Sequence, residues 1–312
     1  MNLRSSYQVA EAIMRKYASS FYAAFGKIDR AKFLDIAAVY AFCRYADDLA
    51  DDTRSSKAIM LQNFDDLENE VRSLFEGASQ ESNYRKYSWW SAFENAIKVR
   101  QIALGPLMDQ IDGQRSDIHF RIIENKEDLI RYCKKVAGTV GLMLAPMLRG
   151  DGADERYEAI CESLGVAMQI TNILRDVGED LRNRNRIYIP RSSMKKYSVT
   201  RKELEELSRS VPIWSKWIVL GPGRRKIKDN VIALWEEMAL LSELYYEEFY
   251  QNLHMFNSDA LFPVTAAAVY YEAILDEVRK NNYNCFTKRC YTSAKTKSDL
   301  RKRVLSRLEK YR

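Results

Sequence analysis

The scarcity of helix-breaking residues constrains the fold of this chain more than any other feature. Its 312 residues include only 6 prolines and 12 glycines. The long intervals between them carry apolar residues at helical spacing, with almost no strand-like alternation. The sequence therefore predicts an all-α protein. No Pro-, Gly- or Ser-rich linker interrupts it, so we expect one domain over residues 1–312.

The apolar periodicity predicts helices over about 6–25, 31–52, 57–76, 84–103, 127–149, 153–180, 224–255 and 260–281. Connections are expected at Pro106 and at the segments RGDGAD, NRNRIYIP and GPG.

Composition and charge narrow the class of protein. With 46% hydrophobic and 29% charged residues, the chain has the profile of a soluble folded protein. A net charge of +6 is mildly basic, so no nucleic-acid partner is expected. The 5 cysteines are scattered without metal-ligand spacing, and the N-terminus lacks an apolar signal core. These features predict a cytoplasmic protein with reduced thiols.

An acidic segment, YADDLADD at 45–52, lies within the predicted helix 31–52, which is otherwise largely apolar. A 4-3-4 spacing keeps four polar residues of this helix within one narrow arc: Tyr40, Arg44, Asp47 and Asp51. The same arc continues an apolar stripe from Phe33 and Ile36, so both carboxylates are expected on an inward face. Carboxylates on such a face need a partner.

A second polar row lies in QITNILRDVGEDLRNRNRIYIP at 169–190. Its oxygen-bearing residues follow a 3-4-4 spacing and again share one helix face: Gln169, Asn172, Asp176 and Asp180. Two helices therefore offer facing oxygen rows. This arrangement suits a hard divalent cation such as Mg²⁺, with waters and substrate phosphates as the remaining ligands.

A solvated acidic face is the alternative interpretation of either row alone. The metal-site hypothesis is favoured because each row pairs its carboxylates with an arginine, Arg44 or Arg175, on a helix that otherwise has a buried pattern. An EF-hand is disfavoured because its ligands alternate within a Gly-containing loop. Histidine-based metal chemistry is disfavoured because His119 and His254 have no co-ligand pattern.

Four segments make this sequence resemble the phytoene/squalene synthase family of head-to-head prenyltransferases, especially its bacterial dehydrosqualene synthases. They are YAFCRYADDLAD at 40–51, YCKKVAGTVG at 132–141, QITNILRDVGEDLRNRNRIYIP at 169–190 and YYEAILDEVR at 270–279. The resemblance covers essentially the whole chain. It implies an all-helical isoprenoid synthase fold whose central cavity is capped by the two acidic rows.

The resemblance also implies about two or three Mg²⁺ ions that bridge the rows to the diphosphates of two prenyl substrates. The metal ligands would be Asp47, Asp51, Asn172, Asp176 and Asp180. The residues with catalytic roles would be Asp47, Asp51, Asp176, Asp180, Tyr132 and Tyr271. The residues that would bind diphosphate are Ser20, Phe21, Tyr40, Arg44, Gln169, Asn172, Arg175, Arg289 and Lys297. Core packing is the alternative for each tyrosine.

By the same resemblance, one allylic diphosphate ionises and its C1 is attacked by the double bond of the second. Proton loss then gives a cyclopropylcarbinyl diphosphate, whose ionisation and rearrangement end in a linear conjugated triene without NADPH. Farnesyl diphosphate and dehydrosqualene are the expected substrate and product. The alternatives are phytoene synthase with geranylgeranyl diphosphate, squalene synthase, and a relative that binds or hydrolyses prenyl diphosphates without condensing them. Ala37 and Ala38 are expected to face the channel, where their small size would admit the longer chain.

The sequence allows two interpretations for each of two further segments. The small residues of VAGTVG at 136–141 either form a helix-packing seam or let a prenyl chain pass. The run from Trp214 and Trp217 to the basic residues that follow either packs over the channel or contacts an anionic membrane at its inner face, where product would leave. A downstream carotenoid desaturase is the candidate protein partner.

Overall fold

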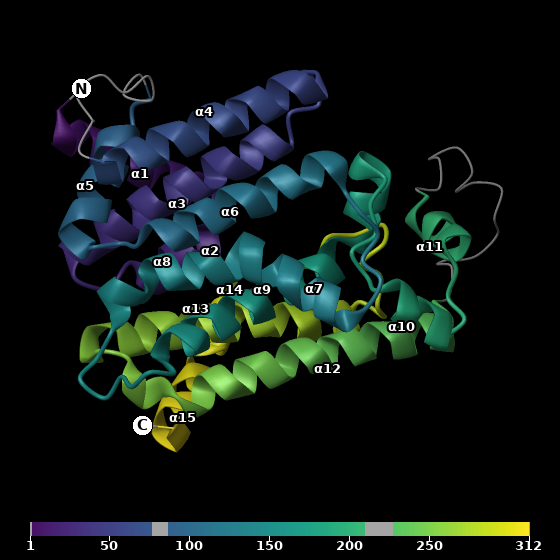
Figure 1. Ribbon diagram of the computed structural model, residues 1–312. Coiled ribbons are helices and arrows are strands. Elements are labelled where there is room, and N and C mark those ends of the chain that lie inside the picture. Colours follow the sequence, from purple (N-terminus) through teal and green to yellow (C-terminus); the bar gives the residue numbers. More distant parts are fainter. Residues whose placement is uncertain (1, 77–86, 210–226, 312) are drawn as a thin grey trace.

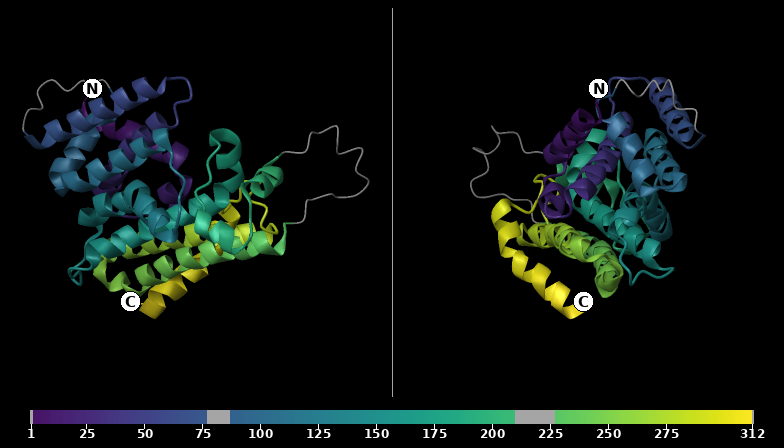
Figure 2. Two further views of the ribbon diagram at one scale, coloured as in Figure 1. Left: turned by 45° about the vertical axis from the view of Figure 1, so that its right-hand side comes forward. Right: turned by 90° about the vertical axis from the view of Figure 1, so that its left-hand side faces the viewer.

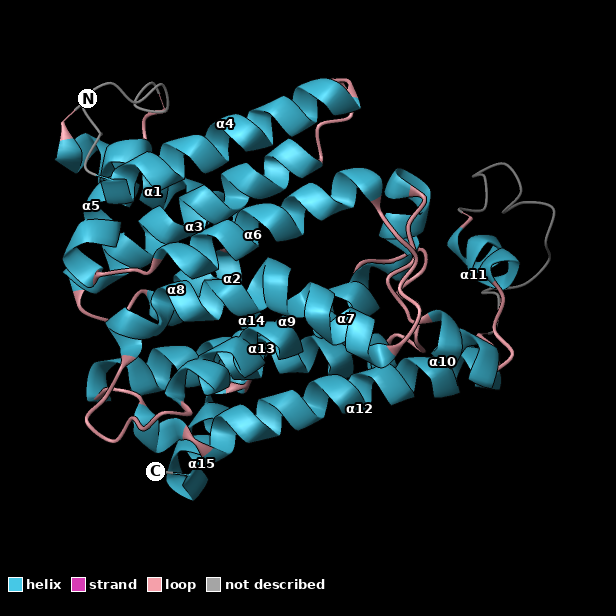
Figure 3. Ribbon diagram, in the orientation of Figure 1, coloured by secondary structure: helices cyan, strands magenta, loops and turns pink. Residues whose placement is uncertain are grey.

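The computed structural model describes residues 2–76, 87–209 and 227–311, which form a helical bundle without a β-strand in those ranges (Figure 1, Figure 3). One isolated bridge joins Arg149 and Phe256. The all-α prediction is therefore confirmed.

The α-helices are α1 (Leu3–Tyr17), α2 (Ser19–Phe25), α3 (Arg30–Ala50), α4 (Lys57–Glu76), α5 (Trp90–Arg100), α6 (Leu104–Ser116), α7 (Lys126–Cys133), α8 (Thr139–Leu148), α9 (Tyr157–Arg184), α10 (Arg191–Lys196), α11 (Arg201–Ser208), α12 (Asp229–Gln251), α13 (Ser258–Lys280), α14 (Ala294–Asp299) and α15 (Arg301–Tyr311). Two 3₁₀ turns, η2 (Asp117–His119) and η5 (Leu253–Met255), and a π-helical turn, η3 (Lys134–Gly138), accompany them.

Several predicted boundaries need correction. The first predicted helix breaks at Ala18, whose backbone leaves helical geometry between α1 and α2. Pro106 was expected in a connection but lies in the first turn of α6, where a missing N–H leaves no helical hydrogen bond unmade. The sequence pattern also missed α6, α10, α11, α14 and α15, most of which are too short to show a clear periodicity.

Local polar residues start and stop the helices that carry the acidic rows. The Asp29 carboxylate caps α3 by accepting hydrogen bonds from the backbone N–H groups of Ala31 at 3.0 Å and Lys32 at 3.1 Å. Helix α9 ends at Asn185, which adopts a left-handed conformation with φ of 56°. The chain therefore turns away from α9 just after its last residue, Arg184.

Helix α9 runs through the middle of the molecule and packs against α8, α12 and α13 (Figure 1). Helices α3, α4 and α6 lie on one side of it, whereas α12, α13 and α15 lie on the other, in both views of Figure 2. Two clusters of buried apolar residues fill the bundle, and α9 and α12 contribute to both. These shared helices are consistent with one domain, which stays a prediction.

The C-terminal helix α15 docks on the bundle through the buried carboxylate of Glu272 in α13. Glu272 forms ion pairs with Arg303 at 2.8 Å and Arg307 at 3.6 Å, and accepts a hydrogen bond from Tyr250. We expect Glu272→Gln to lower the free energy of unfolding by about 1 kcal/mol, because Arg303 and Arg307 each lose one carboxylate partner and keep only Asp276 or Glu247. Urea denaturation measures the change. Glu277→Gln is the control, since its pair with exposed Lys280 is expected to contribute under about 0.5 kcal/mol; an equal loss in both variants would contradict the prediction.

None of the helices in the described ranges has the length and apolar character needed to cross a bilayer. The aromatic run at Trp214 and Trp217, and the GPG connection, lie outside the described residues.

Candidate active site

The two predicted oxygen rows line one polar cleft between α3 and α9. Its empty volume is about 1600 Å³. The cleft brings together most of the predicted site residues: Tyr40, Arg44, Asp47, Asp51, Tyr132, Gln169, Asn172, Arg175, Asp176, Asp180, Tyr271 and Arg289. Residues distant in sequence therefore share one site, although their roles stay predictions.

The α3 row is held by an arginine of its own helix. Arg44 pairs with Asp47 at 3.1 Å and with Asp48, and its guanidinium stacks on the Tyr17 ring at 4.6 Å. Burial, followed by the charge of nearby Asp51, raises the pKa of Asp47 to about 6, although Arg44 opposes this shift. The row thus holds more negative charge than Arg44 compensates.

The α9 row shows the same pattern. Arg175 forms a forked contact with Asp176, at 2.8 Å from Nε and 2.5 Å from a terminal nitrogen. Arg289 approaches the same carboxylate at 3.3 Å. Burial raises the pKa of Asp180 to about 6, against the opposing charge of Arg184. Burial therefore disfavours the charged form of Asp180 unless a cation lies against it.

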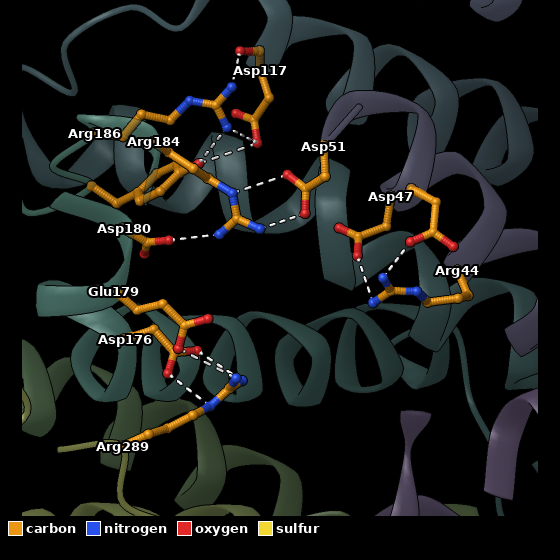
Figure 4. A network of polar contacts seen from close by, with 12 residues as sticks. Arg44, Asp47, Asp51, Asp117, Asp176, Glu179, Asp180, Arg184, Arg186 and Arg289 are labelled. Atoms are coloured by element: carbon orange, nitrogen blue, oxygen red, sulfur yellow. Dashed lines mark hydrogen bonds and ion pairs between the residues drawn. The ribbon is translucent and has the colours of Figure 1, made fainter. Parts of the chain in front are cut away.

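Arg184 connects the two rows. Its Nε donates to Asp51 Oδ1 at 2.9 Å, and one terminal nitrogen donates to Asp180 Oδ1 at 2.8 Å. The other terminal nitrogen contacts the second Asp51 oxygen. Figure 4 shows this guanidinium between the two carboxylates, with Asp47 and Asp176 further along the same cleft. The contacts demonstrate that the two rows face each other.

A close approach at Gly178 brings Arg289 to the cleft. A Cβ at Gly178 would lie 1.8 Å from the carbonyl oxygen of Phe286, so a side chain there would displace the segment after α13. The same segment is held by Arg182, whose guanidinium donates to the Phe286 carbonyl. With Gly178, the segment packs directly on α9 and Arg289 reaches Asp176 and Glu179.

A second polar cluster centres on Asp117, which follows α6. Its Oδ2 accepts hydrogen bonds from Tyr132 and Tyr188, each at 3.2 Å, and pairs with Arg186 at 3.3 Å. Its Oδ1 is buried and has no hydrogen-bond partner among the described residues. Burial raises the pKa of Asp117, with Arg186 the main opposing charge. Tyr132 is thereby fixed at the cleft wall, next to the acidic rows.

An apolar pocket with an empty volume of about 1000 Å³ adjoins the cleft. Five residues line both cavities and so mark the junction between them: Tyr40, Cys43, Val140, Asn172 and Tyr271. The pocket lining that is not shared with the cleft is largely apolar and includes Phe25, Ile36 and Val264. A ligand with a charged head and a long apolar chain fits this pairing of cavities.

The residues that line the pocket correct one sequence prediction and bear on another. Ala37 and Ala38 do not line it, because Ile36, Val39 and Tyr40 occupy the inward arc of α3. The helix-packing interpretation of VAGTVG has direct contacts in the structure, whereas passage of a prenyl chain stays a prediction. Gly141 is a packing residue, since a Cβ there would lie 2.1 Å from the Cys161 carbonyl oxygen, yet Ala137, Val140 and Gly141 also line the pocket.

Three predicted diphosphate contacts lie outside the polar cleft. Phe21 faces the apolar pocket, where its ring meets the Tyr271 ring edge-on at 5.5 Å, so it would contact an apolar chain rather than a diphosphate. Ser20 on α2 and Lys297 on α14 line neither cavity. Their assignment to the diphosphates stays a prediction.

Sequence reasoning missed three residues that the structure places in the cleft, Asp117, Glu179 and Arg184, and it also missed Arg186, which pairs with Asp117. The position of Arg184 could have been predicted from the sequence, because it extends the row that begins at Gln169 by one further interval of four residues. Arg186 was assigned to a plain connection, and Asp117 lies in a short turn without periodicity. Only tertiary contacts reveal these two.

The predicted Mg²⁺ ligands fit a divalent cation in their chemistry. The Oδ1 atom of Asn172 is buried at the junction of the cavities and accepts no hydrogen bond from the part of the chain that the structure describes, while its amide donates to Gln169 at 3.3 Å. This amide oxygen is therefore available as a ligand for a divalent cation, next to the carboxylates of the same row. Within the described ranges, no three Asp, Glu, His or Cys side chains converge into a ready-made metal cage, so substrate phosphates and waters would complete the coordination.

An all-helical bundle with an apolar pocket beneath two carboxylate rows defines the isoprenoid synthase class of fold. Comparisons with known proteins agree. The family model for squalene/phytoene synthase matches residues 14–296. A 4,4'-diapophytoene synthase of Staphylococcus haemolyticus is 33% identical over 284 residues, covering 90% of each chain. A 15-cis-phytoene synthase of Synechococcus elongatus is 30% identical over 302 residues, covering 93% of this chain and 89% of the relative.

Solved structures give the same result. The crystal structure of a dehydrosqualene synthase in complex with ligand has a TM-score of 0.82 and 32% identity, covering 99% of this chain and 98% of that one. A squalene synthase from Alicyclobacillus acidocaldarius, with a TM-score of 0.73 and 22% identity over 90% of this chain and 96% of its own, shares the fold. The chain therefore belongs to the squalene/phytoene synthase family, and it is a prenyltransferase-type enzyme of isoprenoid and carotenoid biosynthesis.

Proposed function

We propose that this enzyme joins two farnesyl diphosphates head to head, through cyclopropylcarbinyl (presqualene) diphosphate, to dehydrosqualene without NADPH. The observation that carries the proposal is the direct junction of the apolar pocket with the two-row polar cleft. The relatives named for dehydrosqualene and 4,4'-diapophytoene synthesis support this branch of the family.

The chain's own residues supply most of what the reaction requires. Arg44 on the α3 wall, and Arg175, Arg184 and Arg289 on the α9 side, offer forked N–H donors to a departing pyrophosphate. The apolar pocket keeps water from an allylic carbocation, which would otherwise be quenched. The aromatic face of Tyr271, at the junction of the cavities, can lie against such a cation.

Mg²⁺ is the proposed cofactor, and Asp47 and Asp51 on one side and Asn172, Asp176 and Asp180 on the other would hold it. When bound, Mg²⁺ would stabilise the negative charge that develops on pyrophosphate.

A second candidate function is phytoene synthesis from geranylgeranyl diphosphate. It is favoured by the 30% identity and nearly full coverage of the Synechococcus elongatus phytoene synthase. The two functions differ in the depth of apolar pocket that the prenyl chain needs.

The deciding experiment is incubation of the purified enzyme and Mg²⁺ with farnesyl or geranylgeranyl diphosphate, separately, followed by identification of the hydrocarbon. We expect a thirty-carbon conjugated triene from farnesyl diphosphate and a much lower rate with the longer substrate. Faster formation of a forty-carbon product would assign phytoene synthesis instead.

NADPH provides a second arm of the same assay. We expect neither rate nor product to change when NADPH is added. Squalene that forms only with NADPH would contradict the proposed branch and place the enzyme with squalene synthases. Peripheral membrane contact and a carotenoid desaturase partner stay predictions.

A further inference from the structure

Arg184 is the side chain that ties the two acidic rows to each other. The other arginines of the cleft each serve one row: Arg44 pairs with α3, and Arg175 and Arg289 pair with α9. Arg184 alone, among the pairs formed by described residues, contacts Asp51 and Asp180 together. Neither the family resemblance nor the proposed reaction assigns it this position.

The contacts of Arg184 use oxygens that the proposed metal ligands would offer. Both oxygens of Asp51 and one oxygen of Asp180 accept hydrogen bonds from its guanidinium. A carboxylate oxygen engaged with a forked guanidinium is a poorer ligand, since the two cations compete for the same lone pairs. Metal binding at these two residues therefore has to break contacts that Arg184 already makes.

We propose that Arg184 is a resident counter-cation that holds the two rows together and that Mg²⁺ with a diphosphate displaces from Asp51 and Asp180. The inference rests on the proposed Mg²⁺-dependent function and adds a residue that sets the affinity of the metal site. The displaced guanidinium stays beside the cleft, where it can donate to the diphosphate.

Two features of the structure favour the replacement of the Arg184 guanidinium by Mg²⁺. Arg184 is the last residue of α9, and its side chain is 35% exposed, so it can turn without unpacking the core. The carboxylates that it bridges also lie on facing helices, and each has a second carboxylate on its own row, Asp47 before Asp51 and Asp176 before Asp180. Without a cation between them, like charges on facing helices would repel each other.

Thermal denaturation of Arg184→Gln tests the proposal. In EDTA, the variant should melt at a lower temperature than wild type because the two rows lose their link. With saturating Mg²⁺ and inorganic pyrophosphate, the deficit should disappear or reverse, since the added ions replace the link. Arg156→Gln is the matched control: Arg156 is exposed, pairs with Asp154 at the opposite end of α9, and should show the same small difference under both conditions.

A deficit of equal size in EDTA and in Mg²⁺ with pyrophosphate would show an ordinary structural ion pair and overturn the proposal. The absence of any deficit in EDTA would also overturn it. If Arg184→Gln fails to fold, Arg184→Lys takes its place. Lysine keeps the charge but lacks the fork that spans both carboxylates, so an intermediate deficit that Mg²⁺ and pyrophosphate remove is expected.

Titration with Mn²⁺, followed by electron paramagnetic resonance of the free ion, measures the competition directly. Arg184→Gln should bind Mn²⁺ about tenfold more tightly than wild type. Equal or weaker binding by the variant overturns the proposal. This outcome is separable from the proposed function, because the hydrocarbon assay identifies substrate and product in wild type without reference to Arg184.

Discussion

Asp176→Asn is expected to lower hydrocarbon formation about a thousandfold while leaving the helical circular dichroism spectrum unchanged. Asp176 is central to the α9 row, contacts both Arg175 and Arg289, and is a proposed metal ligand. The amide keeps the shape of the side chain but removes the charge. Asp47→Asn should have a similar effect on the α3 row. Product assay and circular dichroism on the same preparation measure both properties.

Asp112→Asn is the control for these two variants. Asp112 is exposed, pairs with Lys135 and does not line the cleft, so its loss of charge should leave turnover near the wild-type value. Near-normal hydrocarbon formation by Asp47→Asn or Asp176→Asn would contradict the metal assignment of that row.

Gly178→Ala is expected to destabilise the protein by about 2 kcal/mol and to reduce turnover. The added methyl group would lie 1.8 Å from the Phe286 carbonyl oxygen, so the backbone after α13 must move away from α9. That movement carries Arg289 away from Asp176, which removes a donor from the cleft. Urea denaturation gives the stability change and the product assay gives the change in turnover.

Gly105→Ala is the matched control, made by the same chemical change in helix α6. Apart from its chain neighbours and the backbone of its own helix, no atom of the described residues lies within 4 Å of a Cβ built at Gly105. The substitution should therefore stabilise the protein by about 0.5 to 1 kcal/mol by restricting the unfolded chain, with turnover unchanged. If both glycine variants behave alike, the close contact at Gly178 is not the cause of its effect.

The candidate site shows where sequence reasoning succeeds. Asp47 and Asp51 share a helix face because three- and four-residue intervals return to the same side of an α-helix, and the same rule groups Asn172, Asp176 and Asp180. These are local relations, so they can be deduced without knowing how the helices pack. The structure places all five residues along one cleft.

The lining of the apolar pocket could not be predicted correctly from the sequence. Ala37 and Ala38 were expected to face the channel on the basis of size, but the rotation of α3 against its neighbours directs Ile36 and Val39 there instead. Phe21 carries an apolar ring to the pocket, although the resemblance grouped it with diphosphate contacts. Helix rotation depends on the packing of every neighbouring helix, which periodicity alone does not specify.

The sequence by itself determined the helical class of this protein, its two oxygen rows and its family, because each depends on residue types at short spacing or on motifs. Only the tertiary structure decided that Arg184 links Asp51 to Asp180, that Asp117 holds Tyr132, and that the contact at Gly178 brings Arg289 to Asp176. Apart from the pair of Arg184 with Asp180, which lie four residues apart on α9, each of these contacts joins segments that are separate in the chain. Such contacts follow from how the helices pack together, so no local pattern encodes them.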